Sequence, residues 1–146
     1  MSEGPGGHQD SRNRDSAGEN NDVHAWYRRG LDLLGKGSPA AAANLLQRAA
    51  AEVPDSRSVR EALARAQFNT GHYTEAADNF RVNAEASPTD DYAHFGLGLS
   101  LARTGDHAGA APWLALAAAM RPDRKAYNDA LRQVRATLRA RRRTGG

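Results

Sequence analysis

The stretch DYAHFGLGLSLARTGDHAGAAPWLALAAAMRP, residues 91–122, carries a pattern that occurs three times along the chain. Its glycine, alanine and proline positions recur at one fixed spacing: Gly37, Gly71 and Gly105; Ala42, Ala76 and Ala110; Pro54, Pro88 and Pro122. A period of about 34 residues predicts a helix–turn–helix unit stacked in three copies. Such a stack presents an extended surface rather than a catalytic pocket.

Small residues stand where the two helices of each unit are expected to cross. They occupy positions 30, 64 and 98, as Gly30, Ala64 and Gly98. Larger side chains, Leu46, Phe80 and Leu114, are expected to fill the space beside each crossing. A single pair of helices cannot bury its whole apolar face, so neighbouring units must stack to form a continuous core.

The period divides residues 23–122 into three units, with approximate bounds 23–56, 57–90 and 91–124. Residues 1–22 contain almost no apolar side chain and are expected to be disordered. Residues 123–143 combine an apolar stripe with several arginines, which predicts a basic capping helix over the last unit. Residues 144–146 are expected to fray.

Several residues are candidates for helix starts and breaks. Ser38, followed by Pro39, is a candidate N-cap, as is Asp123. Ser58 and Glu61 have capping-box spacing, although Asp55 or Ser56 could open the same helix. The pair Asp90–Asp91 favours capping over acid–base chemistry. Pro112 falls inside a predicted helix, where proline usually produces a kink.

The composition restricts the chain to a single domain of 146 residues without cysteine, which excludes disulfides and thiolate metal sites. No segment has the apolar length of a membrane span or the pattern of a secretion signal, so a cytoplasmic protein is expected. The formal net charge is +3. Residues 123–146 hold eight basic and two acidic residues, so the positive charge lies in this segment. The excess of arginine over lysine indicates a bacterial origin.

The repeated pattern resembles the tetratricopeptide repeat, whose unit contains W-x₂-L-G-x₂-Y, A-x₃-F and a closing proline. Its positions are occupied in the first unit by Trp26, Arg29, Gly30, Leu33, Ala42, Leu46, Ala49 and Pro54. In the second they are occupied by Arg60, Leu63, Ala64, Gln67, Ala76, Phe80, Asn83 and Pro88, and in the third by His94, Leu97, Gly98, Leu101, Ala110, Leu114, Ala117 and Pro122. The resemblance implies an all-α solenoid with a right-handed superhelical twist.

The resemblance also implies a concave groove lined by the first helix of each unit, in which a peptide or helix of another protein binds. The matching positions are Tyr27, Leu31, Glu61, Arg65, Phe68, Asn69, Tyr92, Phe95, Leu99 and Arg103. Aromatic residues and arginines are common binding anchors. The alternative is that the apolar members of this set pack between repeats. The function expected from this resemblance is that of a non-enzymatic adaptor or scaffold.

One well-known mode of binding in this family, a Lys and Asn clamp for a chaperone's C-terminal carboxylates, is not expected here. The matching positions are Tyr27, Leu31, Ala62, Tyr92 and Gly96, none of which supplies a cation or an amide. The chain is therefore not expected to bind chaperone tails in that way.

Two other functions stay open, and neither requires a cofactor, a metal or a membrane. The arginines near the end of the chain could contact a nucleic acid or a ribonucleoprotein, or could simply favour the end of a helix: Arg139, Arg141, Arg142 and Arg143. The chain could also self-associate through exposed helices, with Trp113 on an outer face. The five histidines show no metal-binding spacing, and no nucleophile or phosphate-loop motif is present.

Overall fold

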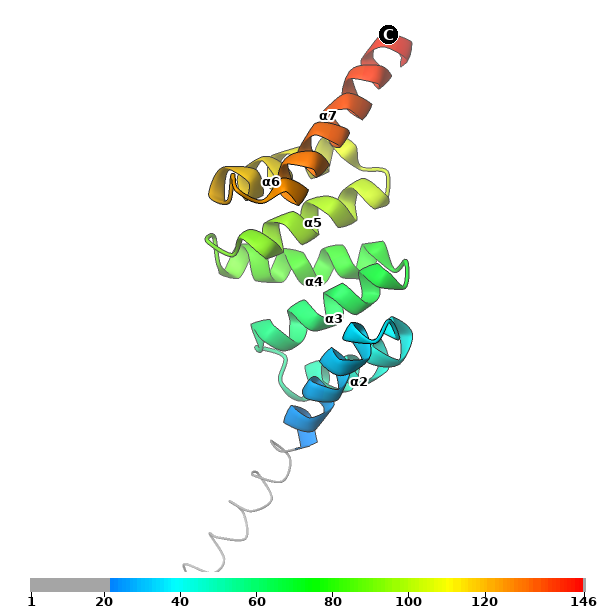
Figure 1. Ribbon diagram of the computed structural model, residues 1–146, viewed down its shortest axis with the longest axis vertical. Helices are drawn as coiled ribbons and strands as arrows, with labels where there is room; N and C mark the ends of the chain where they lie inside the picture. The colour runs from blue at the N-terminus through cyan, green and yellow to red at the C-terminus, as the bar shows by residue number, and fades with distance from the viewer. Residues whose placement is uncertain (1–21, 146) are drawn as a thin grey trace, which may run out of the picture.

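The computed structural model describes residues 22–145, and they form a stack of helices joined by short turns (Figure 1). Residues 22–35 are helical. The helices that follow are α2 (Pro39–Glu52), α3 (Arg57–Asn69), α4 (Tyr73–Ala86), α5 (Asp91–Arg103), α6 (His107–Met120) and α7 (Lys125–Gly145). The expected disordered segment lies outside the described residues except for Asp22, which is helical.

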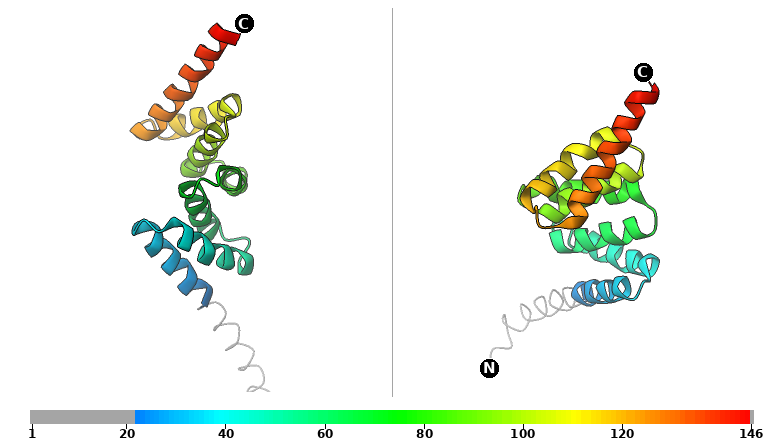
Figure 2. Two further views of the ribbon diagram at one scale, coloured as in Figure 1. Left: turned by 90° about the vertical axis from the view of Figure 1, so that its right-hand side faces the viewer. Right: turned by 45° about the horizontal axis from the view of Figure 1, so that its top comes forward.

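Consecutive helices pack against each other, and the stack curves. From α2 to α7, each helix contacts the next one in the chain. In addition α3 contacts α5 and α5 contacts α7, whereas no such contact joins α2 to α4 or α4 to α6. The odd-numbered helices therefore lie closer together and form the inner side of the curve, as the two views of Figure 2 also indicate. The predicted all-α solenoid is confirmed.

Close approach of the paired helices depends on the predicted small residues. A Cβ atom at Gly30 would lie 2.6 Å from Cγ of Leu46, and one at Gly98 would lie 2.6 Å from Cγ of Leu114. Ala64, at the corresponding position of the second unit, is fully buried. The larger side chain on the second helix thus fills the space left by the small residue on the first, as predicted.

The turn inside each unit ends the first helix in the same way. Gly37, Gly71 and Gly105 have φ of 78°, 83° and 96°, a region that favours glycine. After Gly37 the amide of Ser38 donates to the carbonyl of Leu33 at 2.8 Å, and Gly37 N donates to Leu34 O at 3.1 Å. This pair of bonds is a Schellman motif. The same two bonds occur around Gly71 and around Gly105.

The helix caps resolve the alternatives left by the sequence. Ser56, not Ser58, caps α3, and its hydroxyl accepts a hydrogen bond from Val59 N at 3.2 Å. Asp90 caps α5 as predicted, accepting from Ala93 N at 3.1 Å. Ser38 precedes α2 but makes no side-chain capping bond. Asp123 is not the cap of α7, because the helix starts at Lys125 and the carbonyl of Arg124 accepts its first bond, from Asn128 N. Asp123 instead forms a 2.9 Å salt bridge with Arg121.

Helix α6 continues through Pro112 rather than ending there. Proline has no amide hydrogen, so the carbonyl of Ala108 loses its usual partner one turn earlier. Ala108 and Pro112 are both exposed, which leaves that carbonyl open to water. The proline is tolerated because it lies on the outer face of the helix.

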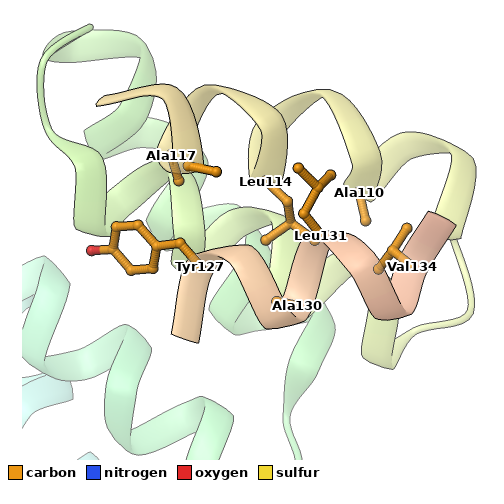
Figure 3. Close-up of a cluster of buried hydrophobic side chains, with 8 residues drawn as sticks. Ala110, Leu114, Ala117, Tyr127, Ala130, Leu131 and Val134 are labelled. Atoms are coloured by element: carbon orange, nitrogen blue, oxygen red, sulfur yellow. The ribbon is translucent and has the colours of Figure 1, made fainter. Parts of the chain in front are cut away.

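Helix α7 covers the end of the last unit (Figure 3). Four of its residues, Tyr127, Ala130, Leu131 and Val134, are buried against Ala110, Leu114, Ala117 and Ala118 of α6. The helix extends to Gly145, two residues beyond the expected end of the capping helix. The Thr144 hydroxyl bonds back to the carbonyl of Ala140 at 3.1 Å there. Within residues 22–145, no helix has the length and hydrophobicity needed to cross a membrane.

Candidate functional site

The inner side of the solenoid contains a hollow of about 270 Å³ between α3 and α5. Six of the predicted groove residues line this hollow, and two further residues complete its wall. The lining consists of Arg65, Phe68, Asn69, Phe80, Tyr92, Phe95, Gly96 and Leu99. The hollow is thus built mainly from two neighbouring inner helices, each of which presents one face to it.

Three aromatic rings form one wall of the hollow. The Tyr92 ring meets the Phe80 ring edge to face, with centroids 6.0 Å apart, and is tilted against Phe95 at 6.4 Å. Gly96 gives the Phe80 ring its place, since a Cβ atom at Gly96 would lie 2.6 Å from three ring carbons. Without a side chain at position 96, a ring from the outer helix α4 reaches the inner surface.

The polar rim of the hollow comes from α3. Arg65 and Asn69 stand one helical turn apart, and Arg65 forms no salt bridge with any carboxylate of residues 22–145. Burial raises the pKa of Tyr92, an effect that the nearby Arg65 partly offsets. Burial also raises the pKa of Glu61, as does Asp90, while Arg65 and Arg57 lower it. The guanidinium of Arg65 is therefore the main cation at this rim.

Arg103 lies against aromatic rings instead of entering the hollow. Its guanidinium carbon is 5.3 Å from the ring centroid of Phe68 and 5.8 Å from that of Tyr73. It also donates a 3.4 Å hydrogen bond to the Tyr73 hydroxyl. Phe68 and Tyr73 themselves meet edge to face at 5.0 Å. Arg103 supports the edge of the site by a cation–π contact.

The predicted groove residues of the first unit are separated from this hollow. Tyr27 lines a different hollow of about 320 Å³, together with Val53, Ser56 and Val59. Leu31 packs against the core cluster around Leu46 and Leu63. Glu61 is half-buried on α3 and does not line the hollow. For Leu31, the packing alternative matches the observed position.

Sequence reasoning did not include Phe80 and Gly96 in the predicted lining, although it named Gly96 as a clamp position without a polar group, and it missed the neighbouring Tyr73. Phe80 was assigned to the core, where it is indeed buried, although its ring edge also reaches the hollow. Gly96 follows four residues after Tyr92, at a position where the second unit has Ala62. Phe80 is larger than Leu46 and Leu114, the residues at the corresponding positions. A glycine at position 96 could therefore have indicated that the Phe80 ring needs extra space. Tyr73, which accepts the hydrogen bond from Arg103, had no signal of its own.

The predicted polyanion-contact residues lie on the last turns of α7. Arg139, Arg142 and Arg143 are exposed and make no salt bridge within the described part of the chain. Arg141 is also exposed, but its Nη1 reaches the carbonyl of Gly105 at 3.5 Å. The four arginines therefore do not share a single face.

Two other sequence interpretations have structural outcomes. Trp113 is half-buried, with its ring 5.5 Å from the ring of His94, so it does not lie free on an outer face. Within the part of the chain that the structure describes, the exposed large apolar residues are instead Val82 and Leu116, with exposed fractions of 46% and 49%. Buried His94 bonds through Nδ1 to the carbonyl of Asp90 at 2.7 Å. Among residues 22–145, no three acidic, histidine or cysteine side chains gather as metal ligands would.

Comparison with solved structures finds the same fold in several proteins. MamA AMB-1 is 24% identical over 80% of the chain, with a TM-score of 0.71, and the chain spans 64% of that MamA chain. The Sgt2 TPR domain from Aspergillus fumigatus is 16% identical with a TM-score of 0.76, covering 86% of this chain and 84% of that one. The first TPR of Spaghetti (RPAP3), bound to the HSP90 peptide SRMEEVD, is 13% identical with a TM-score of 0.74, covering 81% and 94%.

At these identities the structural likeness extends to the fold alone. A search of curated protein sequences finds no significant match. The family model of the tetratricopeptide repeat, in contrast, matches residues 27–91 and 81–125, which include most of the solenoid. The chain belongs to the tetratricopeptide repeat family.

Proposed function

We propose that this protein is a non-enzymatic adaptor that binds a peptide segment of another protein on the concave face between α3 and α5. The observation that carries the proposal is the convergence of Arg65, Phe68, Asn69, Tyr92, Phe95 and Leu99 on one open hollow. These residues come from two helices and two repeat units. Their convergence gives the inner surface a single site of mixed aromatic and cationic character.

The size of the hollow favours a side chain of a polypeptide over a small molecule. Ligand pockets usually measure about 300–1,000 Å³, and this one measures about 270 Å³. It accommodates one large apolar residue of a partner. Burial of such a residue contributes roughly 1.5–3 kcal/mol. Neighbouring positions on the inner surface would add to this contribution.

The charge at the rim favours an acidic group near the apolar anchor. Arg65 forms no salt bridge within residues 22–145, although the nearby Glu61 interacts with its charge, and Asn69 beside it offers an amide. A guanidinium binds a carboxylate in a bidentate fashion. We expect the partner segment to place an aspartate or glutamate about one helical turn, or two to three extended residues, from its apolar anchor.

A fold neighbour gives general support for the mode of binding. The first TPR of Spaghetti (RPAP3) is bound to an HSP90 peptide in its structure. The present chain offers Tyr27, Leu31, Ala62, Tyr92 and Gly96 at the positions of the carboxylate clamp, so its partner would be recognised by other contacts. The aromatic side chains of the hollow, together with Arg65, supply them in this proposal.

Selection of peptides from a random phage-displayed library tests the proposal. Enriched peptides should share a large apolar residue near an acidic one, and fluorescence anisotropy with a labelled peptide would measure their affinity. Arg65→Glu should weaken binding at least tenfold by reversing the rim charge, and Leu99→Trp should weaken it by filling the hollow. Arg28→Glu is the matched control, because Arg28 is exposed and does not line the hollow. Equal binding by all three variants would overturn the proposal.

A further inference from the structure

The outer face of α7 carries a row of arginines that the groove does not explain. At 3.6 residues per turn, Arg132, Arg135, Arg139, Arg142 and Arg143 fall within about 60° of Arg139 around the helix axis. All five are exposed. The opposite face of the helix holds Tyr127, Ala130 and Val134, which pack on α6.

Most of these arginines lack an acidic neighbour. Arg132 forms a 2.7 Å salt bridge with Asp129, but no carboxylate of residues 22–145 lies within salt-bridge distance of the other four. The N-terminal part of the row borders a hollow of about 560 Å³ lined by Asn128, Leu131, Arg132, Arg135 and Arg139. The face is therefore cationic and partly concave.

The arginine row is longer than helix capping requires. Cations favour a helix C-terminus only within about its last turn, which accounts for Arg142 and Arg143 at most. Arg132 and Arg135 stand two to three turns earlier, in the middle of α7. The row spans about 16 Å along the axis at 1.5 Å per residue. An interaction with an extended anion explains this length.

The last turns of α7 project beyond the other helices (Figures 1 and 2). Their sequence includes Arg139, Arg141, Arg142 and Arg143. Residues 139–145 are all exposed. Arg141 lies about 160° from Arg139 around the axis, on the side where its Nη1 reaches Gly105 O. The four arginines of these turns are spread over about 200° of the helix circumference, which is complementary to a groove with negative charge on both walls.

We propose that this segment of α7 docks in the major groove of duplex DNA through contacts with phosphates. The groove is about 12 Å wide and admits an α-helix, whose diameter with side chains is about 10–12 Å. After Leu138 the projecting turns contain only Arg, Ala, Thr and Gly, so arginine is the only charged residue there and phosphates are its main expected targets. Binding through these phosphate contacts is therefore expected to be sensitive to salt.

The same observations disfavour two other anionic partners. A membrane surface would require large apolar residues beside the arginines, but the exposed large apolar residues within the described range are Val82 of α4 and Leu116 of α6. An acidic peptide lying along the helix would contact one face and leave the cations around the projecting turns unused.

The test uses the full chain and a fluorescein-labelled 24-base-pair DNA duplex, followed by fluorescence anisotropy between 50 and 200 mM NaCl. The triple variant Arg135→Gln, Arg139→Gln, Arg142→Gln removes three charges from the row. The matched control Arg28→Gln, Arg29→Gln, Arg48→Gln removes three exposed charges from the first unit. Circular dichroism checks that both variants remain helical, since glutamine is also a good helix former.

We expect the α7 variant to lose at least tenfold in affinity at 100 mM NaCl and the control to lose less than threefold. The slope of log affinity against log salt should fall by about 2 to 3 in the α7 variant, at roughly 0.9 per phosphate contact. Similar losses in both variants would overturn the proposal, because they would indicate an effect of net charge alone. The proposal would also be overturned if the protein bound poly-glutamate, anionic vesicles or duplex RNA more strongly than duplex DNA. Duplex RNA is a useful comparison because its major groove is deep and narrow.

Discussion

The ring of Phe95 stacks on the ring of Tyr127, with centroids 4.5 Å apart and planes inclined by 26°. Phe95 lines the hollow on the inner surface, whereas Tyr127 belongs to the terminal helix α7. The Tyr127 hydroxyl also donates a 2.7 Å hydrogen bond to Asp91, the first residue of α5. The capping helix therefore supports the wall of the candidate site as well as covering the core.

Removing the Tyr127 hydroxyl should destabilise the protein. Tyr127→Phe keeps the ring but deletes a hydrogen bond to a carboxylate, a class of bond that contributes about 1.5–3 kcal/mol. Tyr73→Phe is the control, since its hydroxyl only accepts a 3.4 Å bond from exposed Arg103. Urea unfolding followed by circular dichroism measures both. Equal stabilities for the two variants would show that the bond to Asp91 contributes little.

Stability should fall at alkaline pH because of the same residue. Burial raises the pKa of Tyr127 above its ordinary value of 10, and the hydrogen bond to Asp91 raises it further. The unfolded chain therefore releases this proton first, so the stabilisation is complete below about pH 10 and is lost as the pH rises beyond it. Urea midpoints between about pH 8.5 and 11.5 should fall less steeply for Tyr127→Phe than for wild type. Identical pH profiles would contradict this assignment.

A methyl group at Gly98 should separate α5 from α6. The added Cβ of Gly98→Ala would lie 2.6 Å from Cγ of Leu114 and 3.2 Å from the carbonyl oxygen of Ala110. Such overpacking costs about 1–3 kcal/mol. Gly35→Ala is the control, because nothing lies within 4 Å of its added Cβ and its φ is not positive. Thermal unfolding should show a lower melting temperature for Gly98→Ala. It should show an unchanged or slightly higher melting temperature for Gly35→Ala.

Asn83 should contribute more to the stability of the fold than Ala49 and Ala117, the alanines at the corresponding positions of the other units. Its buried amide donates to the carbonyl of Arg57 at 3.0 Å and accepts from Arg60 at 3.3 Å. Asn83→Ala leaves the Arg57 carbonyl without this partner, and a loss of about 2–3 kcal/mol is expected. Asn79→Ala should reduce stability less, because the 2.8 Å hydrogen bond from Asn79 to Gln67 lies at a half-buried site. Chemical denaturation of the two variants provides the comparison.

Ser100 is expected to show the opposite behaviour. Its hydroxyl is fully buried and has no hydrogen-bond partner among the described residues. Burying a polar group without a partner costs about 1–3 kcal/mol, so Ser100→Ala should be neutral or stabilising by roughly 1 kcal/mol. The second unit already has Ala66 at this position, also fully buried. A clear loss of stability in urea unfolding would contradict the prediction.

The repeat architecture could be predicted because the same local constraints recur in each unit. Gly37, Gly71 and Gly105 stand in turns that need positive φ, and the small residues at helix crossings leave room for their larger partners. The choice between Ser56 and Ser58 as the cap of α3 could not be predicted. Both have a suitable hydroxyl, and the course of the chain after α2 decides which of them precedes the first helical residue.

The candidate site was predictable as a set of positions but not as a shape. The resemblance to the tetratricopeptide repeat placed Arg65, Phe68 and Asn69 on the groove face of α3, where they do line a hollow. It did not indicate that Arg103 would lie over the Phe68 ring, or that Leu31 would pack in the core. Those outcomes depend on contacts with side chains of other helices, and a pattern of matching positions does not specify such contacts.

The amino-acid sequence by itself determined the number of units, their helical pairs, the turns between them and the basic character of α7. Each of these depends on local conformation or on a spacing that repeats along the chain. Only the tertiary structure decided where the hollow lies, how the Phe80 ring reaches it past Gly96, and which arginines of α7 face outward. Those features arise from contacts between residues distant in sequence, because packing and curvature set the distances between neighbouring helices.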